Sequence, residues 1–82
     1  MSKFKNKIKK QYENEGYTVL SLVRVGNGGY PDLLALKNGK AIFIECKEGA
    51  DDIKPLQELR IDELKKNGFE AFCLHNTKGV IY

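Results

Sequence analysis

The chain has 82 residues, of which 41% are hydrophobic and 30% are charged, and its formal net charge is +3. These proportions exclude a disordered chain, and the apolar runs are too short to span a bilayer, so we expect one small globular domain over residues 1–82. The N-terminus has basic residues without a following apolar region, which indicates an intracellular protein. Cys46 and Cys73 lie in apolar runs, and their thiols are interpreted as core side chains rather than as a disulfide or thiolate metal ligands.

The first predicted element is an amphipathic helix over residues 3–15. Phe4, Ile8 and Tyr12 recur at every fourth position as one apolar stripe, and Gly16 is suited to end the helix. The same stretch is rich in lysine: Lys3, Lys5, Lys7, Lys9 and Lys10. Such a cluster can contact the phosphates of a nucleic acid or form the solvated face of a small protein, and both interpretations stay open here.

A strand is expected next, at residues 17–25, which are rich in β-branched and aromatic side chains. Residues 26–29 are expected to form a flexible loop because three of the four are glycine. A hairpin of residues 32–37 and 40–47 follows. Its turn is Asn38-Gly39, because a type I′ turn needs two residues that accept positive φ.

The hairpin turn predicts which residues face each other across the two strands. With Lys37 opposite Lys40, counting outward places Asp32 opposite Glu45 on the same face. Lys47 shares that face because it lies two residues beyond Glu45. Two carboxylates this close repel each other unless a cation offsets their charge, so the pattern predicts a divalent-cation site. The structural alternatives are an Asp32 that caps the glycine-rich loop and a surface ion pair of Glu45 with Lys47.

A second helix is predicted after a polar connection at residues 49–54. Asp52 lies in the expected N-cap region, Pro55 suits the first turn, and the helix should run to about Asn67, with Gly68 ending it. Its apolar residues have roughly helical spacing: Leu56, Leu59, Ile61 and Leu64.

Two further strands complete the predicted order. Residues 69–75 form the first, residues 76–79 turn the chain, and residues 80–82 form a short final strand. The strand at 40–47 is apolar on both faces around its charges, which is typical of a sheet covered on both sides. The order is therefore αβββαββ, with a sheet flanked by helices.

Several of these residues together resemble a known nuclease family. Pro31-Asp32 at the second strand and Glu45-Cys46-Lys47 on the third resemble the PD-(D/E)xK nuclease superfamily. Four segments resemble its virus-type replication-repair nuclease (VRR-NUC) domain: residues 29–34, 43–47, 56–57 and 64–68. The resemblance covers nearly the whole chain and implies an α/β (α+β) fold with a restriction-endonuclease-like αβββαβ core and a mixed central sheet.

The resemblance also implies roles for individual residues. Asp32, Glu45 and the backbone carbonyl of Cys46 would hold Mg²⁺ or Mn²⁺. Lys47 would orient or deprotonate the attacking water, or contact the phosphate. Gln57 would hold the water or the lysine from the helix, although a plain exposed helical glutamine fits the sequence nearly as well.

The chain departs from the family pattern in its first helix. Related domains often carry an acidic residue early in this helix that contributes to the metal site, whereas this chain has Lys5 and Lys7 there. Glu13 and Glu15 are acidic but lie near the helix end, so the resemblance leaves a second metal open.

Two aromatic side chains near these motifs have no role set by the sequence. Tyr30 can stack on a base or close its loop, and His75, at a strand edge, is interpreted as a bystander rather than a general base.

The resemblance implies a substrate and an assembly. The chain is similar to the small stand-alone members of the family, which are typical of phage genomes. The resemblance implies a homodimer that cuts branched DNA such as Holliday junctions. A metal-dependent, structure-selective DNA endonuclease is therefore expected, in the cytoplasm of a bacterium or a phage-infected host, with no membrane partner. The alternatives are an inactive nucleic-acid-binding module with a nuclease fold and a structural subunit of a larger complex.

Overall fold

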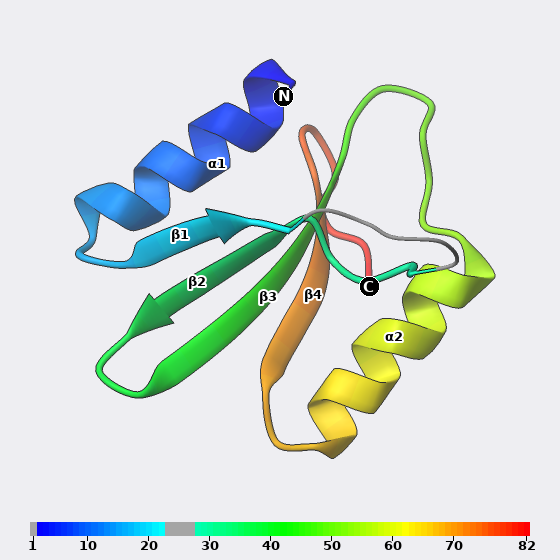
Figure 1. The fold of residues 1–82 in the computed structure, drawn as a ribbon. Coiled ribbons are helices and arrows are strands. Elements are labelled where there is room, and N and C mark those ends of the chain that lie inside the picture. The colour runs from blue at the N-terminus through cyan, green and yellow to red at the C-terminus, as the bar shows by residue number, and fades with distance from the viewer. Residues whose placement is uncertain (1, 23–27) are drawn as a thin grey trace.

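A computed structural model describes residues 2–22 and 28–82 of the chain. Its elements, in chain order, are α1 (Lys3–Asn14), β1 (Thr18–Ser21), β2 (Leu33–Lys37), β3 (Lys40–Lys47), α2 (Pro55–Lys66), β4 (Glu70–His75) and β5 (Gly79–Val80). The strands of the described residues form one mixed sheet in the order β1-β2-β3-β4-β5, and of their pairs only β3–β4 is parallel. In Figure 1, α1 lies along the β1 side of the sheet and α2 along the β4 side. The predicted α+β fold with a mixed sheet is confirmed.

The β2–β3 hairpin has the predicted register. Lys37 pairs with Lys40 and the count continues to Leu33 opposite Ile44. Asn38 and Gly39 have φ angles of 50° and 77°, which is the positive-φ pair that a type I′ turn requires.

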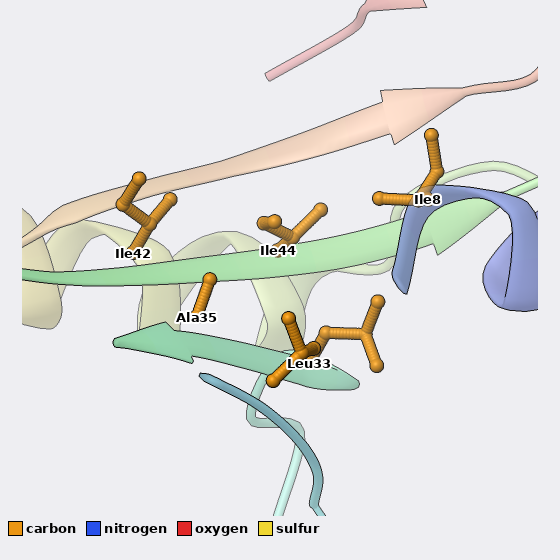
Figure 2. Close-up of a cluster of buried hydrophobic side chains, with 6 residues drawn as sticks. Ile8, Leu33, Ala35, Ile42 and Ile44 are labelled. Carbon is orange, nitrogen blue, oxygen red and sulfur yellow. The ribbon is translucent and has the colours of Figure 1, made fainter. Parts of the chain in front are cut away.

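The two helices cover opposite faces of the sheet. Ile8 of α1 packs on a cluster from β1, β2 and β3 (Figure 2) that contains Val19, Leu33, Ala35, Ile42 and Ile44. Ile61 of α2 packs on a second cluster with Ala71 and Cys73 of β4. Residues 33, 42 and 44 face α1 while residues 43, 71 and 73 face α2, because strand side chains alternate between faces. The sheet is therefore covered on both sides, as predicted.

Both cysteines are free thiols among the described residues. Cys73 is buried in the α2-side cluster, and Cys46 is partly buried against the α1-side cluster. Their interpretation as core residues is confirmed.

Several element boundaries differ from the sequence-based expectations. β1 ends at Ser21, and residues 23–25 of the expected strand, with residues 26 and 27 of the expected loop, lie outside the described residues. The last strand is residues 79–80 rather than 80–82. The N-cap of α2 is Lys54, because the Asp52 carboxylate accepts a hydrogen bond from the adjacent Ile53 N–H instead of reaching the helix.

The buried side of α2 is narrower than its apolar residues suggested. Gln57 and Ile61 are buried and Leu64 packs beside them, whereas Leu56 and Leu59 are exposed. Positions 57, 61 and 64 follow the i, i+4, i+7 spacing of one helix face, and positions 56 and 59 fall outside it. Neither α1 nor α2, the helices of the described residues, is long and apolar enough to cross a membrane.

Candidate functional site

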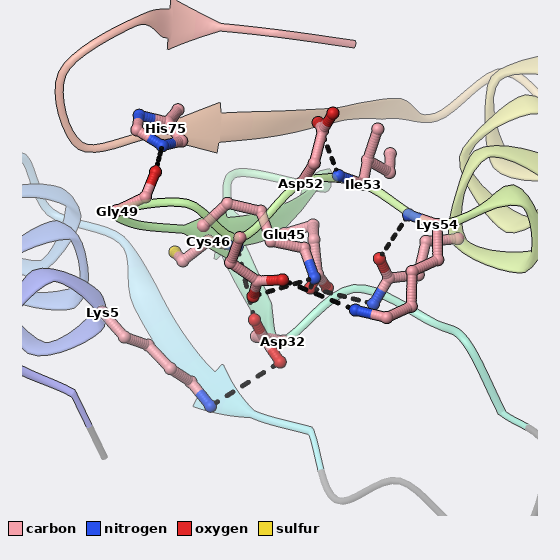
Figure 3. A network of polar contacts seen from close by, with 12 residues as sticks. Lys5, Asp32, Glu45, Cys46, Gly49, Asp52, Ile53, Lys54 and His75 are labelled. Atoms are coloured by element: carbon pink, nitrogen blue, oxygen red, sulfur yellow. Dashed lines mark hydrogen bonds and ion pairs between the residues drawn. The ribbon is translucent and has the colours of Figure 1, made fainter.

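The candidate site lies where β3 ends beside the start of β2. Glu45 and Lys47 stand near the end of β3, and Asp32 immediately precedes β2. Figure 3 shows Asp32 and Glu45 in this corner. Glu45 is only 2% exposed and Lys47 4%. Side chains of these two types are almost never buried unless they are paired, so this corner differs from the rest of the fold.

Asp32 is held in place from both its backbone and its side chain. Its carbonyl accepts a hydrogen bond of 2.8 Å from the Leu22 N–H, and its Oδ2 accepts one of 3.3 Å from the Cys46 N–H. Lys5 of α1 brings its Nζ to 3.9 Å from Asp32 Oδ1, as Figure 3 shows. The position early in the first helix therefore presents an ammonium to Asp32.

Lys47 lies between two carboxylates. Its Nζ is 3.5 Å from Glu45 Oε2 and 3.4 Å from Asp51 Oδ2. The Lys47 ammonium is the largest cause that lowers the pKa of the Asp51 carboxyl below its ordinary value. No sequence motif marks Asp51 as a site residue. Asp51 lies four residues after Lys47, which hints at an ion pair. However, both lie around an irregular connection whose path no periodic pattern predicts, so the contact could not be predicted.

Gln57 links the start of α2 to Glu45. Its Oε1 accepts a hydrogen bond of 3.0 Å from the Lys54 N–H, and its Nε2 donates one of 3.2 Å to Glu45 Oε2. With 5% exposure, Gln57 is not the plain exposed glutamine that the sequence also allowed. Its amide orients the Glu45 carboxylate and satisfies an otherwise unpaired N–H at the helix N-terminus.

The Cys46 backbone faces the same edge of β3 as Asp32. In a strand, the N–H and C=O of one residue project to the same side, so the Cys46 carbonyl points toward β2 like its N–H. Continuing the β2–β3 count places Pro31 opposite Cys46, and proline has no N–H to donate to that carbonyl. Burial raises the pKa of the Cys46 thiol to about 12, with Asp32 adding to the shift, so the sulfur remains protonated at neutral pH.

His75, at the end of β4, is buried and has a structural role as a clamp between two segments. Its Nδ1 accepts hydrogen bonds from the N–H groups of Thr77 (3.1 Å) and Lys78 (3.3 Å), so the ring proton is on Nε2. Nε2 then donates to the Gly49 carbonyl at 2.8 Å. The ring thereby fixes the connection from β3 to α2, which carries Asp51.

The two acidic residues at the end of α1 lie far from Asp32. At a rise of about 1.5 Å per residue, Glu13 and Glu15 are roughly 12 and 15 Å further along the helix than Lys5. The Glu15 carbonyl accepts a hydrogen bond from Lys37 Nζ at 2.6 Å, at the hairpin end of β2. The structure therefore does not bring either residue to the candidate site.

The lysines of α1 divide between two faces of the helix. Lys5 faces Asp32, whereas Lys3, Lys7 and Lys10 line an outward recess of about 420 Å³ together with Asn6, Gln11 and Asn14. These positions share one helical stripe of cationic and amide side chains.

The donor atoms at the site suit a hard divalent cation. Among residues 2–22 and 28–82, no group of three or more His, Cys, Asp or Glu side chains is placed to hold a metal. Asp32, Glu45 and the Cys46 carbonyl instead offer two carboxylates and one neutral oxygen. Mg²⁺ is commonly held by one or two carboxylates while it keeps several waters, so this set fits such an ion.

Comparisons with known proteins agree with this fold. The family model of the VRR-NUC domain matches residues 5–78 of the chain. A solved structure described as a VRR_NUC domain is 29% identical in sequence, with a TM-score of 0.74, and the match covers 85% of this chain and 77% of that one. No curated protein sequence matches the chain. The chain therefore belongs to the VRR-NUC family and is a nuclease-fold domain.

Proposed function

We propose that the chain is a metal-dependent, structure-selective DNA endonuclease, acting as one domain over residues 1–82. The observation that carries the proposal is the buried ion pair of Lys47 with Glu45 beside the Asp32 carboxylate. A buried ion pair is weak evidence for stability, because desolvation of both charges offsets their attraction. Buried ionisable clusters are, however, typical of catalytic sites.

Asp32, Glu45 and the Cys46 carbonyl would hold Mg²⁺ or Mn²⁺. Asp32 accepts a hydrogen bond from the Cys46 N–H and Glu45 accepts one from the Gln57 amide, so each carboxylate is oriented by an uncharged donor in addition to its nearby lysine. The bound ion would supply a water of lowered pKa and offset the charge of the scissile phosphate.

Lys47 would act as a hydrogen-bond donor. An ammonium flanked by Glu45 and Asp51 would have one N–H left to donate to a water or a phosphate oxygen, and would stabilise negative charge as it develops there. Gln57 would keep the Glu45 carboxylate oriented, so we assign it a positioning role.

DNA is the proposed substrate, with a preference for branched forms such as Holliday junctions. The outward stripe of Lys3, Lys7 and Lys10 would contact phosphates without reading sequence. A C₂ homodimer would give so small a domain two cutting sites whose symmetry matches a junction. We place the activity in DNA repair or replication, in the cytoplasm of a bacterium or a phage-infected host.

The decisive experiment compares cleavage of labelled four-way junction, flap and linear duplex by wild type and Lys47→Ala. Each reaction is run with Mg²⁺, with Mn²⁺ and with chelator. We expect metal-dependent cutting by wild type and its loss in Lys47→Ala by at least about 100-fold, since removing one transition-state donor typically costs that much. Lys66→Ala, an exposed lysine at the far end of α2, is the matched control and should cut normally.

The outcomes separate the proposal from its alternative. DNA binding without cutting of any substrate, in either metal, would favour an inactive binding module. Mn²⁺ titration adds an independent readout, because a module without a metal site has no reason to bind Mn²⁺ at Asp32 and Glu45. Equal cutting of all three substrates would contradict the preference for branched DNA.

A further inference from the structure

Tyr30 and Arg60 form an anchored stack beside the candidate site. The Arg60 guanidinium carbon lies 4.6 Å from the centroid of the Tyr30 ring. The guanidinium is itself fixed, since Arg60 Nε donates to the Gly28 carbonyl at 2.9 Å and Nη1 donates to the Glu63 carboxylate at 3.2 Å. Tyr30 is nevertheless 42% exposed. An aromatic ring is thus held from one side by a cation and remains open to solvent.

The loop under Tyr30 is pressed closely against α2. Gly29 has a φ of +62°, and a Cβ at this position would lie 2.6 Å from Leu56 Cγ. A side chain at residue 29 would therefore be strained by the backbone angle and blocked by Leu56. The close approach fixes the loop on the same helix that carries Arg60, so the orientation of Tyr30 is set before any ligand binds.

The stack is adjacent to the proposed metal ligands. Tyr30 lies two residues before Asp32, so their Cα atoms are at most about 7 Å apart. On α2, Arg60 lies three residues after Gln57, which contacts Glu45, and residues at this spacing are neighbours on a helix surface. The ring thus borders the region where the scissile phosphate would bind.

We propose that Tyr30, backed by Arg60, is a stacking platform for an unstacked base of DNA next to the scissile phosphate. The proposal rests on the proposed nuclease function and specifies its substrate. Every base presents a π-face that stacks on aromatic rings without sequence preference, and Arg behind the ring adds a cation–π contact. Bases in a continuous matched duplex are stacked on their neighbours, whereas branch points and flaps offer unstacked bases. The platform therefore favours branched or partly single-stranded DNA over linear duplex.

The first test is DNA binding in chelator, so that cleavage cannot consume the substrate. Stacking on one aromatic residue changes affinity by about 5- to 150-fold per base. We expect Tyr30→Leu to weaken binding of a flap or junction at least about fivefold while duplex binding changes less than about twofold, and Tyr30→Phe to bind like wild type. Phe69→Leu, at a 45% exposed aromatic beyond the other end of α2, is the matched control and should leave binding unchanged.

The second test is spectroscopic. The chain contains no tryptophan, so Tyr30→Trp and Phe69→Trp each introduce a single indole whose emission can be followed separately from that of the tyrosines. A flap should quench the indole emission of the Tyr30→Trp variant more than a linear duplex does, and should leave the emission of the Phe69→Trp variant unchanged. A merely structural Tyr30 would show no such difference between the two DNAs.

Each result bears on the proposal. Equal flap affinity of wild type and Tyr30→Leu, with no substrate-dependent quenching at position 30, would overturn the platform and leave the nuclease proposal standing. Failure of wild type to bind any DNA would overturn both. Far-ultraviolet circular dichroism and thermal unfolding of Tyr30→Leu separate lost stacking from a lost fold, and Tyr30→Trp keeps the test valid if the leucine variant unfolds.

Discussion

At the scale of single residues, Lys5 would compete with the proposed metal for Asp32. Its Nζ lies 3.9 Å from Asp32 Oδ1, and a cation at that distance opposes a second cation at the same carboxylate. We predict that Lys5→Met tightens Mn²⁺ binding by about three- to tenfold, which corresponds to roughly 1 kcal/mol for a partly exposed pair. Isothermal titration calorimetry of the DNA-free protein measures this directly.

Lys7→Met is the matched control for this prediction. Lys7 lies on the same helix but lines the outward recess, so its removal should change Mn²⁺ affinity much less. Weaker Mn²⁺ binding by Lys5→Met would show instead that Lys5 supports the geometry of Asp32.

The two thiols provide a prediction about pH. Burial is the main cause that raises the pKa of Cys46 from 9.0 to about 12 and that of Cys73 from 9.0 to about 11. Above pH 9 the unfolded chain binds fewer protons than the folded one. The stability from these neutral thiols is therefore fully present below pH 9 and is lost as the pH rises toward 11–12.

The same shifts predict slow alkylation of the folded protein. Because the thiolate is the reactive form, iodoacetamide at mildly alkaline pH should modify both cysteines at least about tenfold more slowly in the native protein than in denaturant. Mass spectrometry over time gives both rates. Equal rates would mean that the cysteines are not buried in solution.

Residue-level prediction from sequence succeeded where a local rule applied. The alternation of side chains along the strand at residues 40–47 anticipated that Glu45 and Lys47 share a face. The contact between their side chains follows from this shared face. Asp51 and the clamp by His75 were missed, because both depend on where irregular connections lead. Arg60 was missed for another reason: a lone arginine on a helix gives no sign of which loop it will contact.

At the scale of elements, His75 holds the connection between β3 and α2 to the turn after β4. We predict that His75→Leu lowers the free energy of unfolding by roughly 2–3 kcal/mol, since it removes the hydrogen bonds that the buried imidazole makes with the backbone of Gly49, Thr77 and Lys78. Urea denaturation measures the loss. His75→Asn keeps an acceptor near the Thr77 N–H but loses reach to Gly49, so an intermediate loss is expected. An unchanged midpoint for His75→Leu would contradict the clamp.

The elements themselves were largely predictable, whereas their ends were not. The Asn38-Gly39 turn encodes the register through its own backbone requirement, and the stripe of Phe4, Ile8 and Tyr12 identifies the packed side of α1. The predicted N-cap region of α2, at Asp52, was wrong. The Asp52 carboxylate has an equally local alternative, which is to accept a hydrogen bond from the Ile53 N–H. Leu56 and Leu59 belong to the apolar set of α2 and yet are exposed, because helical spacing alone does not say how wide the neighbouring surface is.

At the scale of the whole molecule, charge on α1 predicts how DNA binding depends on salt. Each neutralised phosphate contributes about 0.9 to the slope of log K against log[salt] for duplex DNA. Replacing Lys3, Lys7 and Lys10 together by Gln should reduce that slope by roughly 2–3 and weaken binding to every DNA alike. Fluorescence anisotropy across a salt series tests this, with Lys66→Gln as control. An unchanged slope would mean that other residues contact the DNA phosphates.

The proposed homodimer makes a separate prediction about mass. Sedimentation equilibrium of wild type should give twice the chain mass of 9.3 kDa at high protein concentration, since a symmetric junction requires two linked sites. A single-chain mass throughout would remove the junction from the proposed substrates while leaving flaps. The sequence anticipated the family, but no surface pattern in it identifies a self-contact.

The parallel pairing of β3 with β4 has a consequence for how such a domain changes over evolution. Lys47 and His75 form the last pair of that ladder, so both connections that leave it, residues 48–54 and 76–78, begin beside the site. Loops at the carboxyl ends of parallel strands can vary in length and composition while the sheet stays intact. Substrate preference can therefore be rewritten in these two connections, by insertion or by grafting, without touching the strands that hold the carboxylates.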